Sequence, residues 1–203
     1  MREHNIPMVM INANYEELDT PCIRVDDVET GYLATKELID HHHKKLLLIS
    51  KTDDLQGKYR MKGFIKACEE ASIGICPDSI LTYTTETEAD VYEQAIKLLA
   101  DNPGITGIFC YNDKIAKNLM SQLVKLGRKI PEDYSIIACD DSSLSLMGGI
   151  ALTSAIHPKE KMGVDAAKWI VNSIKNGQPE GDILYPAELV RRSSIREIDL
   201  EEE

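Results

Sequence analysis

The predicted fold is decided by residues 107–142, which read GIFCYNDKIAKNLMSQLVKLGRKIPEDYSIIACDDS. A short apolar run ends at Asn112-Asp113, a helical segment follows, and a second apolar run ends at Asp140-Asp141. This order is typical of a β-α-β unit with two parallel strands. In an open parallel sheet, ligands bind beyond the carboxyl ends of the strands. We therefore expect the amide of Asn112 and the carboxylate of Asp140 to lie together, in a place suited to a small molecule with hydroxyl groups.

Composition narrows the class of protein further. The 203 residues are 43% hydrophobic, which is enough for one large domain or two small lobes with a real core. The formal net charge of −11 repels phosphate backbones, so nucleic-acid binding by this segment's own surface is not expected. The five cysteines include no C-x-x-C pair, which favours reduced, packed thiols in a cytoplasmic protein. No apolar run approaches the length of a membrane span, so no membrane partner is expected.

Short apolar runs alternate with amphipathic segments along most of the chain. Strands are predicted at 6–12, 22–25, 45–50, 79–83, 107–111, 134–139 and 152–156, with a final strand pair near 183–185 and 188–192. Helices are predicted after Asp26 or Asp27, which can cap the first of them, and over 57–71, 88–100, 113–126 and 159–175. Residues 144–149 are predicted to form a loop. The alternation predicts a doubly wound α/β sheet with right-handed crossovers.

Two parts of the chain do not fit a single sheet. One or two strands before Asp26 cannot make a sheet that buries both faces, and the helix over 159–175 has no neighbour of its own. We therefore expect a second lobe, most of it absent from this chain, and a natural protein that begins upstream. The expected division is 1–25 and 158–180 as a remnant of an N-terminal lobe, 26–157 and 181–198 as a C-terminal lobe, and 199–203 as an acidic tail.

The chain carries a series of motifs in a definite order, spread over nearly its whole length. They are Asp26-Asp27, Arg60-x-x-Gly63-Phe64, residues 111–113 (YND), 131–137 (PEDYSII), 140–142 (DDS), 152–154 (LTS), His157-Pro158 and 186–193 (PAELVRRS). Together they resemble the effector-binding core of LacI/GalR-type bacterial transcription regulators. Finer details are most similar to the arabinose-responsive regulators of that family, namely residues 10–13 (MINA), 53–65 (DDLQGKYRMKGFI), 83–86 (YTTE) and 110–113 (CYND). Those regulators join a GntR-type winged helix-turn-helix to the sugar-binding core. No segment here resembles the winged helix.

The resemblance implies a periplasmic-binding-protein-like fold of two doubly wound, Rossmann-like lobes that hold a sugar, with no cofactor, no metal and no catalysis. It implies a repressor that L-arabinose, the leading ligand, releases from its operator. Operator DNA would be bound through the absent N-terminal domain, and the full-length protein would be a homodimer. A transport-type sugar-binding protein is the alternative, and an upstream signal peptide would favour it. An α/β enzyme using Asp140 is a third possibility, which requires turnover of the sugar.

Three residues match pocket positions of the family most closely. Arg60 matches an arginine that grips sugar hydroxyls, and its guanidinium offers a rigid fork of donors. Asn112 and Asp140 match a strand-end amide and carboxylate, which can together donate to and accept from hydroxyls. The competing interpretations are a surface helix arginine for Arg60 and helix N-caps for Asn112 and Asp140.

Four further residues complete the candidate set. Asn12 matches a strand-end position of the N-terminal lobe that is often acidic in the family. His157 stands before Pro158 where many relatives carry Gln, and a hinge or capping role is equally open. Gln56 is a candidate second donor near Arg60. Tyr83 could offer an aromatic face to the sugar ring, and a core tyrosine is its alternative.

Three other features are weaker signals of chemistry. Residues 41–43 (HHH) are adjacent and do not share one helix face, which favours a helix end over a metal site. Asp140-Asp141 lacks a nearby glycine-rich phosphate loop, which disfavours a magnesium site. Ser142 and Ser143 lack the G-x-S-x-G elbow of a serine hydrolase.

Overall fold

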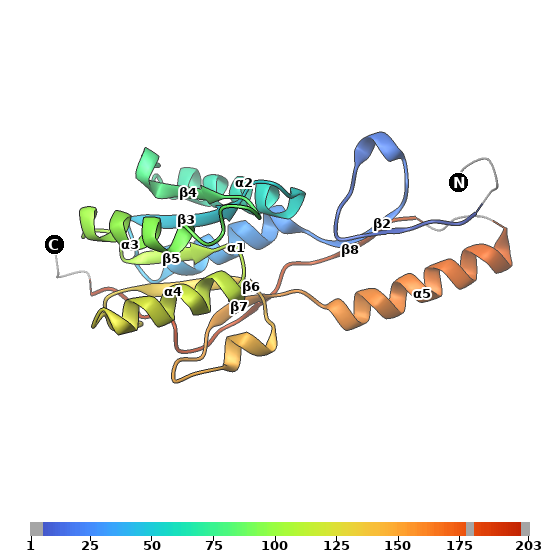
Figure 1. The fold of residues 1–203 in the computed structure, drawn as a ribbon. Coiled ribbons are helices and arrows are strands. Elements are labelled where there is room, and N and C mark those ends of the chain that lie inside the picture. Colours follow the sequence, from blue (N-terminus) through green and yellow to red (C-terminus); the bar gives the residue numbers. More distant parts are fainter. Residues whose placement is uncertain (1–5, 178–180, 200–203) are drawn as a thin grey trace. The chain divides into compact units, whose positions relative to one another are not determined.

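The computed structural model describes residues 6–177 and 181–199, and the chain divides into two compact units (Figure 1). The smaller unit comprises Met1–Asp26 and Pro158–Pro186, and the larger unit comprises Asp27–His157 and Ala187–Glu203. The chain therefore passes between the units three times, after Asp26, His157 and Pro186. Each unit is discontinuous in sequence.

The larger unit is built on a six-stranded sheet with the order β4-β3-β5-β6-β7-β9. Its strands are β3 (Leu46–Lys51), β4 (Ile80–Tyr83), β5 (Gly107–Cys110), β6 (Ser135–Asp140), β7 (Thr153–Ile156) and β9 (Leu189–Val190). Every neighbouring pair is parallel except β7 with β9. The predicted doubly wound sheet is confirmed. The strand order reverses between β3 and β5, which makes their carboxyl ends the switch point where ligands bind in such sheets.

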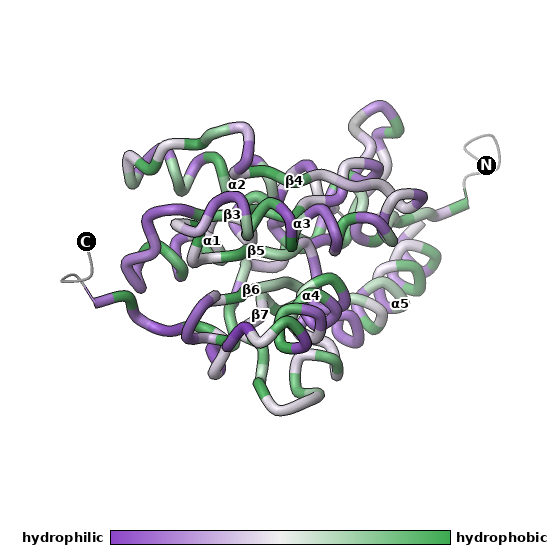
Figure 2. Tube along the Cα trace, turned by 60° about the vertical axis from the view of Figure 1, so that its left-hand side comes forward, coloured by the Kyte–Doolittle hydropathy of each residue, from purple (hydrophilic) through white to green (hydrophobic). Residues whose placement is uncertain are grey.

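Helices cover both faces of this sheet (Figure 1). On one face, α1 (Asp27–Asp40) and α2 (Leu55–Glu70) pack against Leu46 and Leu48 of β3. On the other face, α3 (Val91–Asp101) and α4 (Asp113–Lys125) pack against Leu47 and Ile49. Alternate residues of one strand thus feed two cores, which is why the strand sequences are almost continuously apolar. The hydropathy colouring shows this as green in the central strands and mixed green and purple in the helices (Figure 2).

Two glycines bring α1 and α2 unusually close together. A Cβ atom added to Gly31 of α1 would lie 2.0 Å from the backbone oxygen of Arg60, and one added to Gly63 of α2 would lie 2.1 Å from that of Val28. Only glycine leaves room for such backbone contact between helices. The contact fixes the backbone of Arg60 directly on α1.

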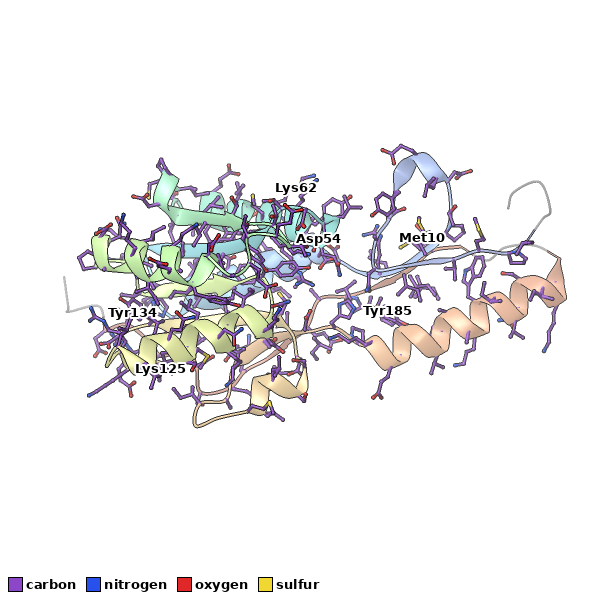
Figure 3. All side chains as sticks on the ribbon, in the orientation of Figure 1. Met10, Asp54, Lys62, Lys125, Tyr134 and Tyr185 are labelled. Carbon is purple, nitrogen blue, oxygen red and sulfur yellow. The ribbon has the colours of Figure 1, made fainter. Side chains whose placement is uncertain are left out.

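The smaller unit contains a three-stranded parallel sheet with the order β1-β2-β8. Its elements are β1 (Met10–Ile11), β2 (Cys22–Val25), β8 (Ile183–Tyr185) and the helix α5 (Lys159–Asn176). Trp169 of α5 is 1% exposed, packs with Ile23 and Val25, and donates from Nε1 to the Gly181 carbonyl oxygen at 3.0 Å. Tyr185 belongs to the same core, and its hydroxyl donates to Asp165 of α5 (Figure 3).

Several sequence-based boundaries need correction. The strand predicted over 6–12 is paired only at Met10–Ile11. The loop predicted over 144–149 overlaps a 3-10 turn, Ser143–Leu146. Residues 200–203 of the predicted acidic tail lie outside the described residues.

The predicted final strand pair is wrong, because its two members belong to different sheets. β8 pairs with β2 of the smaller unit, whereas β9 pairs with β7 of the larger one. The segment 181–186 therefore belongs to the smaller unit, and the expected lobe boundary at residue 181 moves to Pro186.

The segment after β9 runs back along the larger sheet. The Ile136 N–H donates to the Ser194 carbonyl oxygen at 2.8 Å, and the Thr153 N–H donates to Ser194 Oγ at 2.8 Å. Ser194 is fully buried. The segment after β9 thus bonds to both β6 and β7, although α5 and β8 lie between it and these two strands in sequence.

Candidate ligand-binding site

Two of the candidate residues lie at the carboxyl ends of neighbouring strands, since Asn112 follows β5 and Asp140 ends β6. The adjacent strand β3 is followed by Asp54, which caps α2. Figure 3 shows Asp54 at this end of the unit and Lys125 and Tyr134 at the opposite end. Asn112 and Asp140 therefore lie at the strand ends, as the β-α-β pattern predicts, and next to the place where the strand order reverses.

Arg60 is the centre of this arrangement. Its side chain is 3% exposed, so the alternative of a surface helix arginine is wrong. Nε donates to Asp27 Oδ1 at 2.8 Å, and Nη1 donates to the Tyr111 carbonyl oxygen at 2.7 Å. The guanidinium also lies over the Tyr111 ring, with Cζ 5.0 Å from the ring centroid. The guanidinium is thus held by Asp27 of α1 and by the Tyr111 carbonyl, which directly follows β5.

The charge on Arg60 is retained despite its burial. Burial lowers the pKa of an arginine, but electrostatic attraction from the neighbouring groups, the carboxylates of Asp27 and Asp140 among them, outweighs burial, and the pKa of Arg60 is raised. The neighbouring Cys139 thiol stays neutral, since burial raises its pKa to about 12. Burial also raises the pKa of Asp27, and the Arg60 charge opposes that rise. The result is a buried, permanently charged donor group at the strand ends.

Asp140 is the most accessible acceptor beside Arg60, with its side chain 26% exposed. Its Oδ1 lies 3.8 Å from Arg60 Nη2, which is within electrostatic attraction but beyond hydrogen-bond length. Its backbone φ is 106°, a conformation that L-residues rarely adopt. A hydroxyl group that reaches both side chains would accept from Arg60 and donate to Asp140.

Asn112 is at once a helix cap and a member of this group. Its Oδ1 accepts from the Ile115 N–H at 3.0 Å, so the capping interpretation is correct. The side chain is half-buried. Capping engages the side-chain oxygen Oδ1, whereas the Nδ2 group can still donate a hydrogen bond to an oxygen atom of a ligand.

The structure places Tyr83 in the core rather than at the surface of the site. Tyr83 is 4% exposed and packs edge-on against Tyr111, with ring centroids 6.3 Å apart. Tyr111 is half-buried, and its hydroxyl donates to Asp54 Oδ2 at 2.7 Å. Tyr111 is therefore the tyrosine that borders Arg60, and its place directly before Asn112 was the signal that could have identified it.

The remaining candidates are distributed over both units. Gln56 is half-buried in the first turn of α2, next to the Asp54 cap. His157 is half-buried and is the last residue of the larger unit before the chain passes to α5. Asn12 belongs to the smaller unit, where it has φ 73° and a buried Oδ1 that has no hydrogen-bond partner within residues 6–177 and 181–199.

The sequence interpretation missed Asp27, which was assigned only as a helix cap. Its carboxylate is 5% exposed and is the main partner of Arg60. A buried guanidinium, a partly exposed carboxylate and an amide at one sheet edge offer donors and acceptors that suit a neutral polyhydroxyl molecule. Over the part of the chain that the structure describes, no helix has the length and apolarity to cross a membrane. The same residues contain no cluster of three or more His, Cys, Asp or Glu side chains that could hold a metal ion.

This fold and its strand-end site define a periplasmic binding protein-like domain. The family model of that description matches residues 35–195, and the chain belongs to this family, in the LacI/GalR-type form found in transcription regulators. Over 205 aligned residues the chain is 41% identical to the arabinose metabolism transcriptional repressor of Halalkalibacterium halodurans, covering 97% of this chain and 55% of that protein. The chain thus spans about half the length of that relative.

Two solved structures share the fold closely. A transcription regulator from Lactobacillus plantarum superposes with a TM-score of 0.87 and 28% identity, covering 97% of this chain and 75% of that one. A LacI family transcriptional regulator from Enterococcus faecium, with bound ribose, superposes with a TM-score of 0.85 and 26% identity. The superposition covers 98% of this chain and 74% of that one.

Proposed function

We propose that this chain is the sugar-sensing module of a cytoplasmic transcriptional repressor, with L-arabinose as its effector. The observation that carries the proposal is the Arg60 guanidinium, buried at the switch point and held by Asp27, with Asp140 and Asn112 beside it. A site of fixed donors and acceptors suits vicinal hydroxyls. The 41% identity to an arabinose metabolism repressor supports L-arabinose as the leading pentose.

The module would act without chemistry. Sugar would favour one arrangement of a two-state protein, and it can shift the balance only as far as its affinities for the two states differ. In the protein at its full natural length, a homodimer would bind operator DNA through a separate N-terminal domain. Sugar binding would weaken that contact. The net charge of −11 makes this module a poor DNA-binding surface, which is consistent with DNA binding by a separate domain.

The test is calorimetric titration of L-arabinose, D-ribose and D-xylose into the protein at its full natural length, with Asp140→Ala and Arg60→Ala beside the unmodified protein. A hydrogen bond to a charged group contributes enough that Asp140→Ala should weaken L-arabinose binding roughly 10- to 100-fold. Arg128→Ala, which changes an exposed arginine outside the site, is the matched control and should bind normally. Unchanged affinity in both site variants would refute the pocket, and binding of none of the three sugars would refute the function.

A second measurement follows operator DNA. In a fluorescence anisotropy assay, Asp140→Ala and Arg60→Ala should each bind operator DNA as tightly as the unmodified protein does. L-arabinose should no longer release either variant from the DNA. Release at the unmodified protein's sugar concentration in either variant would contradict the assignment. Recovery of chemically unchanged sugar after prolonged incubation would separate this function from an enzyme.

A further inference from the structure

One buried carboxylate joins the two strand ends that carry Asn112 and Asp140. Asp113 directly follows Asn112 and begins α4, and its side chain is 1% exposed. An acid at this position would normally face solvent at a helix N-terminus. Here it points instead into the sheet, toward the segment after β6 and toward β7.

The hydrogen bonds of Asp113 reach two consecutive backbone amides. Oδ2 accepts from the Ser142 N–H at 2.6 Å and from Ser142 Oγ at 2.8 Å. Oδ1 accepts from Ser154 Oγ at 2.6 Å, and Ser154 Oγ in turn accepts from the Asp141 N–H at 3.1 Å. Asp113 thus binds the Ser142 amide directly and the Asp141 amide through one serine.

These amides belong to a strained turn. Asp140 has φ 106° and Asp141 has φ 41°, both in the left-handed region that disfavours L-residues. Two such residues in succession persist only where their surroundings impose the conformation. The Asp141 carboxylate is held from the other side, since it accepts from Arg192 Nη2 at 2.6 Å and from Ser145 Oγ at 3.2 Å.

We propose that Asp113 is a positioning residue of the sugar site, which holds the Asp140–Asp141 turn in its left-handed form and so sets where the Asp140 carboxylate stands relative to Arg60 and Asn112. The inference deepens the proposed function and rests on it. Asp113 does not touch the ligand, because both of its oxygens are engaged and its side chain is buried. It acts on affinity through the backbone that precedes Ser142.

The experiment is a double-mutant cycle between Asp113→Asn and Asp140→Ala, followed by L-arabinose titration of the protein at its full natural length. Asparagine keeps the size of the side chain, but one acceptor becomes an NH₂ group that cannot accept from the Ser142 or Ser154 donors. We expect Asp113→Asn to weaken binding roughly 10-fold or more. In that background the further change Asp140→Ala should matter less than about 3-fold, because the carboxylate is already misplaced.

The control separates positioning from loss of stability. Leu123→Ala opens a cavity at the far end of α4, where Leu123 is 2% exposed in the core. In this destabilised background Asp140→Ala should keep its full effect on affinity. If Asp113→Asn does not fold, Ser154→Ala removes only the link to the Asp141 amide and should weaken binding roughly 3- to 10-fold.

The outcomes distinguish the two proposals. Normal affinity in Asp113→Asn, or a full additional effect of Asp140→Ala in that background, would overturn the positioning role and leave the sugar site intact. If Asp113→Asn does not fold, normal affinity in Ser154→Ala would likewise overturn the positioning role and leave the sugar site intact. Failure of the unmodified protein to bind sugar, or of Asp140→Ala to weaken binding, would overturn the proposed site and the positioning role together.

Discussion

Asp27 and Arg60 form a buried ion pair, with Asp27 Oδ1 2.8 Å from Arg60 Nε and both side chains at most 5% exposed. Asp27 is the first residue of α1 and directly follows the passage of the chain from the smaller unit. Arg60 is the centre of the candidate site. The pair therefore ties the guanidinium of the candidate site to the residue at which the chain enters the larger unit.

Asp27→Asn should be strongly destabilising, because it leaves the Arg60 charge buried without its main partner. Removing one member of a buried pair costs about 3 kcal/mol or more. Urea unfolding followed by circular dichroism measures the loss. Lys36→Ala, which removes an exposed pair with Asp40, should cost no more than about 0.5 kcal/mol. Similar losses in the two variants would show that the Arg60 charge is compensated elsewhere.

Gly31→Ala should separate α1 from α2. The new methyl group would meet the Arg60 backbone oxygen at 2.0 Å, so the helices must move apart, at a cost of about 2–3 kcal/mol. Gly74→Ala is the matched control, since Gly74 has no atom within 4 Å of the added Cβ. Thermal unfolding of both variants checks this. A Gly31→Ala protein as stable as Gly74→Ala would mean that the helix contact is not a constraint.

Asn112→Asp should separate the capping role of Asn112 from its binding role. Aspartate caps a helix about as well as asparagine, so stability should change by less than about 1 kcal/mol. The amide donor is lost, and a carboxylate is added near Asp140. On the proposed function, L-arabinose affinity should fall roughly 10-fold or more. Titration and urea unfolding of the same preparation provide the comparison, and normal affinity would limit Asn112 to capping.

His43 should make stability fall in mild acid. Its side chain is 1% exposed, its Nε2 donates to the Arg196 carbonyl oxygen at 3.2 Å, and its Nδ1 therefore accepts from Thr106 Oγ1 at 2.8 Å. Burial lowers the pKa of His43 from 6.5 to about 4. Between those two values the unfolded chain binds a proton that the folded chain excludes, so stability is complete above pH 6.5 and decreases toward pH 4.

The decrease amounts to about 3 kcal/mol at most by pH 4. Urea midpoints at pH 7 and pH 5 measure it, and His43→Gln should lower the difference between them. His42→Asn, at a histidine that is 39% exposed, should leave the difference unchanged. A His43→Gln protein with the same pH dependence as the unmodified protein would assign the effect to other groups.

Strand and helix positions in the larger unit were predictable because each strand is a nearly continuous apolar run between helical segments. The β3 residues Leu46–Lys51 illustrate this, since alternate side chains enter two cores. The short strands β8 and β9 were located, but their partners were not. Two or three residues carry no information about which sheet they join, because that depends on contacts distant in the chain.

The strand-end candidates were predictable for the same reason, and their contacts were not. Asn112 and Asp140 stand where apolar runs end, so their place at one sheet edge follows from topology. Asp27 and Asp113 stand at helix starts, where a carboxylate is usually a solvated cap. Their actual partners lie 33 and 29 or more residues away, at Arg60, Ser142 and Ser154. No local pattern distinguishes such an acid from a cap.

The antiparallel pairing of β7 with β9 has a consequence for how the protein is made. α5 and β8, which belong to the smaller unit, lie between these two strands in sequence. The sheet of the larger unit therefore cannot be completed on the ribosome until the second segment of the smaller unit has been synthesised. Closing so long a connection is a slow, entropically costly step. Until then the nascent chain exposes the edge of β7, where chaperones or neighbouring nascent chains can pair.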